Sequence, residues 1–260
     1  MMALRGGADL LVATPGRLLD LAGHNAVRLG AVEVLVLDEA DRMLDLGFRD
    51  ELRAVLALLP AARQNLLFSA TRSGAGDLLE AMLKDPAEVG GRTRETPPEA
   101  VEQRVYLVAQ DKKGPLLRHL IRQAGWEQVL VFVASHHGAD TVARKLNNHG
   151  IAALAMHGDL SQGARTGALA GFKDGATRVL VATDLAARGL DIEQLPCVIN
   201  YDLPRSPNDY VHRVGRTGRA GTPGLALSLV APAELQHMRL IEKRTGRRLA
   251  HLDTEGMQLL

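Results

Sequence analysis

Short apolar runs alternate with amphipathic stretches along most of this chain, and that alternation restricts its fold more than any other feature. Runs such as 32–37, 128–134 and 178–182 have the length and the branched side chains of buried strands. Between such runs, apolar residues recur every three or four positions, as in 49–59, which Pro60 ends. Strands that alternate with helices predict an α/β protein with a mainly parallel sheet covered on both faces.

The pattern predicts the position of each element. Pro15 is suited to a first helical position with Thr14 as the helix cap. The expected helices are 15–21, 49–59, 74–83, 113–123, 139–149, 162–172 and 233–243. The expected strands are 9–13, 32–37, 65–68, 101–108, 128–134, 151–155, 178–182, 198–201 and 225–230.

One segment breaks the alternation and divides the chain. Residues 91–100 begin with the second glycine of the pair at 90 and 91, contain two adjacent prolines and lack apolar periodicity, so we interpret them as a linker. Residues 101–245 then hold enough strands for a complete doubly wound domain, with a short tail over 246–260. Residues 1–90 hold only three expected strands, which predicts an incomplete first domain.

Composition limits the classes of function. The formal net charge is only +1, so any nucleic acid must be bound by local basic groups rather than by a global field. Aromatic residues make up 3%, which argues against modules that stack on bases. Cys197 is the single cysteine, so no intrachain disulfide is possible, and we expect a buried small side chain there. No apolar stretch reaches the ~20 residues of a membrane span, and a cytoplasmic location is expected.

Acidic residues follow one predicted strand. The sequence Asp-Glu-Ala-Asp at 38–41 ends the apolar run 34–37, where α/β folds place their chemistry. Mg²⁺ takes one or two carboxylates and keeps several waters, which suits Asp38. Glu39 is placed to orient and deprotonate an attacking water. The alternative is that two acids simply begin a loop.

Two further segments support phosphate chemistry. Ser69 and Thr71 follow the run 66–68, and their hydroxyls suit hydrogen bonds to acids such as Asp41; a helix cap is the alternative. Residues 212–219 read His-Arg-Val-Gly-Arg-Thr-Gly-Arg. Two of these arginines are three positions apart in a glycine-broken turn, and guanidinium groups match phosphate oxygens. A solvated basic loop is the alternative there.

Five segments in this order resemble one family. They are 14–20, 38–41, 69–71, 181–184 with 188–191, and 212–219. Over about residues 5–230 the chain is similar to DEAD-box ATP-dependent RNA helicases. The residues around its motifs are most similar to the bacterial RhlE-like group. The resemblance implies an enzyme with two RecA-like domains that close on ATP and single-stranded RNA.

The resemblance also implies roles for individual residues. It implies Mg²⁺ binding and water activation by Asp38 and Glu39, and a ribose contact by Asp191. The residues implied to couple hydrolysis to domain closure are Asp41, Ser69, Thr71 and His212. The residues implied to contact the γ-phosphate are Arg216 and Arg219.

RNA contacts are implied on both domains. From the first domain they would come from Pro15, Gly16 and Arg17, and from the second from Gln162, Arg165, Thr183 and Gly189. Backbone amides, hydroxyls and scattered arginines hold sugar and phosphate without reading bases. We therefore expect sequence-independent RNA binding that weakens steeply with salt.

The chain departs from the family in one respect. It contains no Gly-x-x-x-x-Gly-Lys-Ser/Thr loop to cradle the β- and γ-phosphates. We expect an N-terminally truncated member that lacks the Walker A strand and loop, binds RNA weakly and hydrolyses ATP negligibly. The alternative is a non-catalytic RNA-binding or partner-docking module. A DNA helicase of the same superfamily is disfavoured by the whole motif set.

Overall fold

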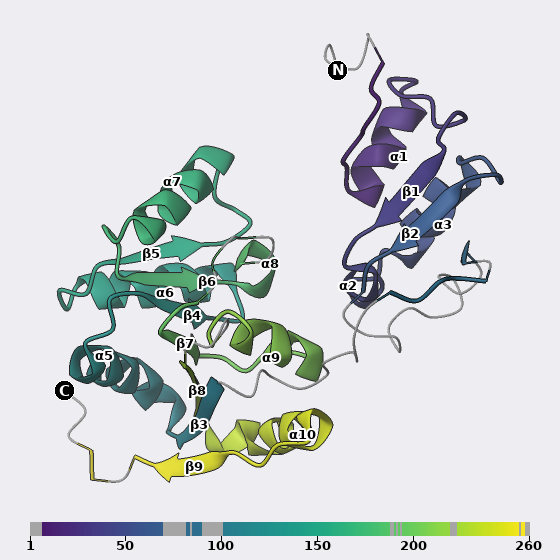
Figure 1. Ribbon diagram of the computed structural model, residues 1–260. Helices are drawn as coiled ribbons and strands as arrows, with labels where there is room; N and C mark the ends of the chain where they lie inside the picture. The colour runs from purple at the N-terminus through teal and green to yellow at the C-terminus, as the bar shows by residue number, and fades with distance from the viewer. Residues whose placement is uncertain are drawn as a thin grey trace. The chain divides into compact units, whose positions relative to one another are not determined.

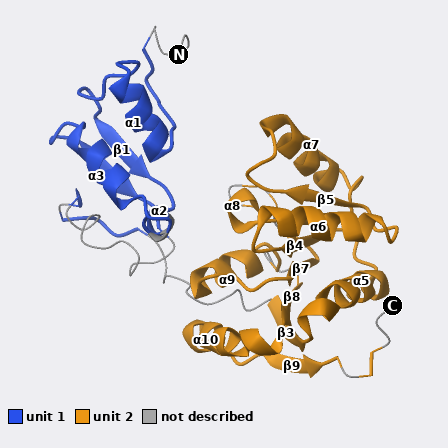
Figure 2. Cartoon of the chain, turned by 180° about the vertical axis from the view of Figure 1, so that it is seen from behind, with its two compact units in different colours: residues 1–95 blue, residues 96–260 orange. Residues whose placement is uncertain are grey.

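The computed structural model describes most of the chain. The described residues are 7–69, 82–83, 85–89, 101–187, 190, 192, 194–218, 223–254 and 256–257, without the side chains of Arg42 and Asp45. The chain forms two compact units, residues 1–95 and residues 96–260, shown in blue and orange in Figure 2. The expected linker 91–100 lies outside the described residues.

Unit 1 is a small α/β unit around a two-stranded parallel sheet (Figure 1). The strands pair in register from Val34 opposite Gln64 to Leu37 opposite Leu67. Helix α1 begins at Pro15, as expected, and the Thr14 carbonyl accepts the first helical hydrogen bond from the Leu18 amide at 2.9 Å. The elements are α1 (Pro15–Gly23), β1 (Val34–Leu37), α2 (Ala40–Asp45), α3 (Arg49–Ala57) and β2 (Gln64–Leu67).

Two expectations for unit 1 need correction. The strand predicted over 9–13 is absent from the described structure, because Leu10 and Val12 are 80% and 87% exposed and pair with no described strand. Helix α2 was not among the expected helices, and a loop at 38–41 was the alternative interpretation; the helix begins at Ala40, which is fully buried. Most of the helix predicted over 74–83 lies outside the described residues.

Unit 2 contains a seven-stranded, entirely parallel sheet in the order β5-β6-β4-β7-β8-β3-β9. Every residue of the central strands β4, β6 and β7 is buried. Such strands need cover on both faces, which agrees with the expected α/β class. The strands are β3 (Val101–Leu107), β4 (Val129–Phe132), β5 (Ala153–Met156), β6 (Val179–Ala182), β7 (Cys197–Asn200), β8 (Gly224–Val230) and β9 (Ala250–Asp253).

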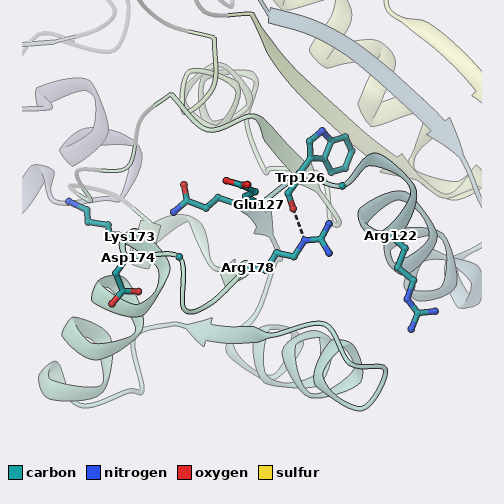
Figure 3. A pocket seen from close by; sticks show the side chains of 9 residues that line it. Arg122, Trp126, Glu127, Lys173, Asp174 and Arg178 are labelled. Atoms are coloured by element: carbon teal, nitrogen blue, oxygen red, sulfur yellow. Dashed lines mark hydrogen bonds between the residues drawn. The ribbon is translucent and has the colours of Figure 1, made fainter.

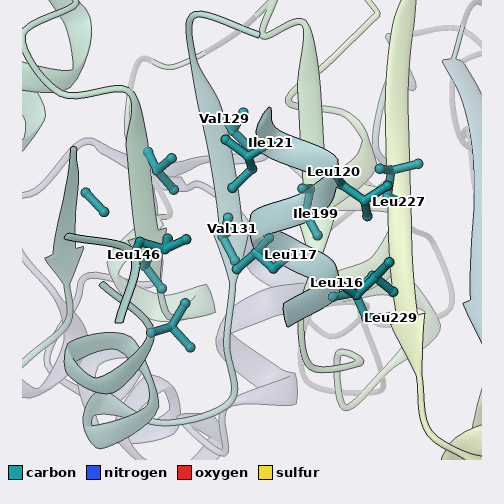
Figure 4. Packing of buried hydrophobic residues seen from close by; sticks show 14 of the residues in the cluster. Leu116, Leu117, Leu120, Ile121, Val129, Val131, Leu146, Ile199, Leu227 and Leu229 are labelled. Carbon is teal, nitrogen blue, oxygen red and sulfur yellow. The ribbon is translucent and has the colours of Figure 1, made fainter. Parts of the chain in front are cut away.

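The helices of unit 2 cover both faces of this sheet. Alternate residues of β4 enter different cores: Val131 packs in the cluster with α5 and α6, and Phe132 in the cluster with α7 and α8. Figure 4 shows the first core, where leucines of α5 lie over β4, β7 and β8. The helices are α5 (Lys113–Ala124), α6 (His136–Asn147), α7 (Gln162–Lys173), α8 (Asp184–Ala187), α9 (Pro207–Val214) and α10 (Leu235–Thr245), with single 3-10 turns at Gln110–Lys112 and Pro232–Glu234.

Three elements of unit 2 were not predicted from the sequence pattern. Strand β9 lies in the expected tail 246–260 and pairs with β3 at the sheet edge. Its residues are mostly exposed, so an edge strand of this kind has no apolar run to reveal it. Helices α8 and α9 are short, and α9 begins at Pro207 because Ser206 accepts the Asp209 amide at 3.1 Å.

Helix α6 begins at His136, three residues before the expected start at 139. The hydroxyl of Ser135 accepts the Gly138 amide at 3.0 Å and so caps the helix early. Cys197 is fully buried in β7, as expected, and burial raises the pKa of its thiol. In the described parts of the chain, no helix is long and apolar enough to cross a membrane.

Candidate functional site

The pairing of β1 with β2 brings two sequence motifs to one sheet edge. The Phe68 amide donates to the Leu37 carbonyl at 2.8 Å, and the Ala40 amide donates to the Phe68 carbonyl at 3.0 Å. These bonds continue the strand pairing past both strand ends. Residues 38–41 therefore run alongside residues 68–69 at the carboxyl edge of the sheet, which is where parallel sheets carry their sites.

The three acids at this edge have different environments. Asp38 and Glu39 are exposed, whereas Asp41 is only 5% exposed. Glu39 has the left-handed φ of 50°, and its amide donates to Asp38 Oδ1 at 2.9 Å. A non-glycine residue in this region is strained, and such strain gathers at functional sites. The exposed pair offers hard oxygen ligands, while Asp41 belongs to the packed side of α2.

Ser69 lies at the same edge, one residue past the Phe68 carbonyl that the Ala40 amide contacts. The structure thus brings Ser69 close to the acidic segment along the backbone. Thr71, expected in the same motif, lies outside the described residues.

The first turn of α1 is open to solvent. Gly16 and Arg17 are exposed and Pro15 is half-buried, and a Cβ on Gly16 would meet nothing within 4 Å. Thr14 makes no side-chain cap, so amides of the first turn are open to an external acceptor. Arg17 pairs with Asp20 at 2.6 Å on the surface. A helix start of this kind suits a phosphate group.

Unit 2 gathers its expected residues around the carboxyl ends of β5 and β6. Gln162 begins α7 and is exposed, after Ser161 caps the helix by accepting the Ala164 amide at 3.2 Å. Thr183 follows β6, and its amide donates to the Met156 carbonyl of β5 at 3.2 Å. Strands β5 and β6 are neighbours, so α7 and Thr183 lie at one edge. Gly189 and Asp191 lie outside the described residues.

Two of the residues expected to contact RNA in unit 2 have buried polar side-chain atoms without a hydrogen-bond partner. The Thr183 hydroxyl and the Arg165 Nε are buried and make no hydrogen bond. Buried polar groups are normally paired, so these two atoms are available to hydrogen-bond a bound group at this edge. Among the RNA contacts expected in unit 2, Thr183 and Arg165 therefore have the strongest structural support.

The segment 212–218 begins on α9 and ends beside β7. His212 is exposed, and the half-buried Arg216 donates from Nη1 to the Leu190 carbonyl at 3.1 Å. Thr217 is fully buried and bonds to the Leu195 carbonyl. Arg219, the second expected phosphate ligand, lies outside the described residues.

Arg213, which makes more side-chain hydrogen bonds than its neighbours in this segment of the described structure, was not predicted from the sequence. It is 2% exposed, and its Nε and Nη2 donate to the Asp184 carboxylate at 2.6 and 2.8 Å. Its Nη1 donates to Asn200 Oδ1 at 3.0 Å and to the Asp202 carbonyl at 2.7 Å, and its guanidinium lies 4.8 Å from the Phe132 ring centroid.

The hydrogen bonds of the Arg213 guanidinium connect α9 to the ends of β6 and β7 and so position the turn that carries Arg216. The sequence carries only a partial signal, the helical spacing of residues 210, 213 and 214; that all three are buried is seen only in the structure. An arginine in that stripe needs buried acceptors.

A hollow of about 680 Å³ lies elsewhere in unit 2 (Figure 3). Its lining residues precede β4 and β6 and so belong to the amino ends of these strands; they are residues 122, 125–128, 173–175 and 178. Arg178 donates from Nε to the Trp126 carbonyl at 2.5 Å, as the dashed line shows. The hollow is therefore at the edge opposite the motif residues and is separate from the candidate site.

Comparison with known proteins agrees with these motifs. The description "DEAD/DEAH box helicase" matches residues 1–77, and "Helicase conserved C-terminal domain" matches residues 112–221. The DEAD-box ATP-dependent RNA helicase CshA of Bacillus subtilis is 41% identical over 95% of this chain and 50% of its own length. The ATP-dependent RNA helicase RhlB of Pseudomonas syringae is 42% identical over 93% of this chain and 62% of its own. The chain thus spans about half to three fifths of these relatives.

Solved structures extend the agreement to the fold. Dbp5 of S. cerevisiae, bound to RNA and ADP BeF3, is 32% identical with a TM-score of 0.85, over 96% of this chain and 66% of that one. A DEAD box protein from Methanococcus jannaschii is 34% identical with a TM-score of 0.58, over 95% and 67%.

Parallel α/β units with these motifs at their carboxyl edges define the RecA-like class of helicase domains. The chain belongs to the DEAD-box family of ATP-dependent RNA helicases, whose members are enzymes. The narrower RhlE-like assignment stays a prediction.

Proposed function

We propose that this protein is an ATP-dependent RNA helicase in which RNA-stimulated ATP hydrolysis drives local unwinding of RNA duplexes. The observation that carries the proposal is the pairing at the edge of β1 and β2, which sets the acids of 38–41 beside Ser69. Dbp5, a similar protein, has been solved with RNA and ADP BeF3, which supports RNA and a nucleotide as ligands here. We propose residues 1–90 and 101–245 as the two helicase domains, joined by 91–100, and the cytoplasm as their location.

The exposed acids suit the hydrolytic step. Asp38 and Glu39 are adjacent, exposed carboxylates at the sheet edge, which fits a hard divalent cation. We assign Mg²⁺ binding to both and water activation to Glu39. Mg²⁺ bound there would neutralise charge that develops on the phosphates. Glu39 would orient the attacking water and accept its proton.

The other motif residues are assigned to the phosphates and to coupling. We assign the γ-phosphate contact to Arg216 and Arg219, because guanidinium groups stabilise charge in phosphoryl transfer. Asp191 is assigned to the ribose. The residues assigned to coupling of hydrolysis and domain closure are Asp41, Ser69, Thr71 and His212.

RNA is proposed to bind through its backbone. In unit 1 the uncapped first turn of α1 offers amides and the Arg17 side chain to phosphate. In unit 2 the unpaired polar atoms of Arg165 and Thr183 support the same role. The residues assigned to RNA are Pro15, Gly16, Arg17, Gln162, Arg165, Thr183 and Gly189.

The catalytic assignment is tested with a supplied phosphate loop. The 260 residues contain no Gly-x-x-x-x-Gly-Lys-Ser/Thr motif, so we expect them to hydrolyse ATP negligibly. A fusion to the loop-bearing segment of a relative such as RhlB should show RNA-stimulated ATP hydrolysis. Glu39→Gln should abolish that activity, while Glu33→Gln, a matched exposed glutamate before β1, should preserve it. Turnover by the 260 residues that Glu39→Gln abolishes would refute the expectation for the isolated chain.

The RNA assignment is tested on the chain itself. Fluorescence anisotropy with labelled single-stranded RNA at several salt concentrations should show weak, sequence-independent, salt-sensitive binding. Arg165→Ala should weaken binding and lower the salt slope by about one, as loss of a phosphate contact does. Arg144→Ala, on the exposed end of α6, is the matched control and should change neither. Equal effects of the two variants would contradict the assignment.

The absence of a phosphate-loop motif from these residues keeps a second candidate in view, a non-catalytic RNA-binding or partner-docking module. The fusion separates the two. An enzyme regains hydrolysis that depends on Glu39, whereas a module binds RNA without turnover.

A further inference from the structure

Two histidines and two aspartates of unit 2 form a cluster that no step above uses. His136 is the first residue of α6, and His157 and Asp159 follow β5. The imidazole rings of the histidines stack with centroids 5.1 Å apart. His136 Nδ1 lies 2.8 Å from Asp159 Oδ2. Side-chain ligand atoms of His136, His157 and Asp159 all lie within 4.8 Å of one another.

The second imidazole of this cluster has an unsatisfied nitrogen. His157 is 4% exposed, and its Nδ1 is buried without a hydrogen-bond partner. Its other nitrogen, Nε2, lies 3.0 Å from Asp140 Oδ1. A carboxylate accepts a hydrogen bond, so this contact places a hydrogen on Nε2. In the neutral imidazole, Nδ1 then carries a lone pair. Burial of a ring nitrogen costs free energy unless its lone pair accepts a hydrogen bond or binds a metal ion.

The same arrangement is typical of metal-binding histidines. Such a histidine usually binds the ion through one nitrogen and donates from the other to a carboxylate, which fixes the ring and raises its basicity. Asp140 occupies that carboxylate position for His157. A stacked histidine pair held only by hydrogen bonds explains the His136–Asp159 contact, but it leaves the buried Nδ1 of His157 without a role.

We propose that His136, His157 and Asp159 bind a divalent transition-metal ion of the Zn²⁺ type, with Asp140 as the positioning residue for His157. Two borderline imidazole ligands with one carboxylate suit such ions better than Mg²⁺, which prefers oxygen ligands alone, and water would complete the coordination. Ligands at about 2.0–2.2 Å from a tetrahedral ion stand about 3.4 Å apart. The side chains of His136 and Asp159 are 42% and 75% exposed, so a small rotation of each toward the buried His157 would bring the three ligand atoms to this spacing.

The site would link two segments of unit 2. It joins the start of α6 to the connection between β5 and α7, and Asp159 is two residues before the Ser161 cap of α7. Gln162 and Arg165 follow on that helix. A bound ion would hold the connection against α6 and so restrict the first turn of α7.

The test is a titration of the tag-free 260-residue chain with Zn²⁺ in competition with a chromophoric chelator. We expect one equivalent to bind. His136→Gln and Asp159→Asn should each weaken binding at least about tenfold, and Asp140→Asn about 10–100-fold. His137→Gln is the matched control, because His137 is exposed, adjacent and outside the cluster. Its affinity should equal that of the parent chain.

Thermal unfolding provides the control for folding. Without metal, Asp159→Asn and the parent chain should unfold at the same temperature, because Asp159 is exposed. Zn²⁺ should raise the unfolding temperature of the parent and of His137→Gln but not that of Asp159→Asn. Failure of the parent to bind Zn²⁺, or equal binding by all variants, would overturn the proposal.

Discussion

Strand β1 in unit 1 and strands β4 and β6 in unit 2 have nearly the same sequence but different surroundings. They read Val-Leu-Val-Leu, Val-Leu-Val-Phe and Val-Leu-Val-Ala. All residues of β4 and β6 are buried, whereas Val34 and Val36 of β1 are 48% and 50% exposed in the described structure. An apolar run therefore specifies a strand, but its neighbours decide how much of it is buried.

The difference in cover predicts a difference in stability. Full burial of one valine or leucine side chain contributes about 1.5–3 kcal/mol relative to exposure. The buried cluster of unit 1 consists of Leu37, Ala40 and Leu52 with partly buried neighbours, while unit 2 has three larger clusters. We expect unit 1 to be marginally stable and unit 2 to carry most of the stability.

Hydrogen exchange should show the largest effect. Amides of β4, β6 and β7 open only with unit 2 as a whole, whereas those of β1 and β2 open with a smaller unit. A difference of about 4 kcal/mol in opening free energy corresponds to exchange on the order of 10³-fold slower in unit 2. Mass spectrometry of the exchanging peptides measures this, and equally slow exchange in both sheets would sink the comparison.

Removal of a buried ion pair should come next. Arg213→Met leaves the Asp184 carboxylate and Asn200 Oδ1 without their donor, and such a loss costs about 3–5 kcal/mol. Trp126, the single tryptophan, reports unfolding of unit 2 in urea. The comparison variant is Arg17→Met in unit 1, where the pair with Asp20 is exposed and its loss should cost at most about 1 kcal/mol. The effect of Arg17→Met is measured by hydrogen exchange of the β1 amides. Stability losses of equal size in the two variants would contradict the expected difference between the units.

Cavity variants provide a slightly smaller contrast. Leu117→Ala removes a side chain that is 1% exposed in the core of Figure 4 and should cost about 2–5 kcal/mol. Leu66→Ala in β2 removes one that is 38% exposed, so we expect a loss below about 1 kcal/mol. Urea denaturation followed by Trp126 measures the first, and exchange of β2 amides measures the second. A large loss for Leu66→Ala would mean that unit 1 is better covered than its described residues indicate.

The smallest expected effect is a gain in unit 1. Glu39 has a φ of 50°, which costs a non-glycine residue about 1–2 kcal/mol. Glu39→Gly should therefore raise the opening free energy of the β1 amides by up to about 1 kcal/mol and slow their exchange. Glu39→Gln keeps the Cβ and the strain and is the matched control. In the loop-bearing fusion both variants should lack ATP hydrolysis. Equal exchange rates for the glycine and glutamine variants would show that the backbone at this position is not strained.

Much of this fold was predictable from local pattern. Helices α1, α3, α5 and α7 lie close to the expected ranges, because apolar spacing, caps and Pro15 are local signals. The edge strand β9 and the helix α9 were missed because their cues are weak or short. Of the expected site residues, Asp38, Glu39 and Ser69 lie at one edge and Arg165 and Thr183 at another. Arg213 was missed, since the sequence does not show that its acceptors are 11 to 29 residues away.

The sequence by itself determined the α/β class, the strand-forming runs and the ordered motifs that identify a DEAD-box helicase. Those properties depend on the spacing of residues along the chain. Only the tertiary structure decided the strand order, the pairing of β9 with β3, the burial of Arg213 and the meeting of His136 with His157. Each of these depends on contacts between distant segments, and local side-chain patterns carry no record of which segments become neighbours.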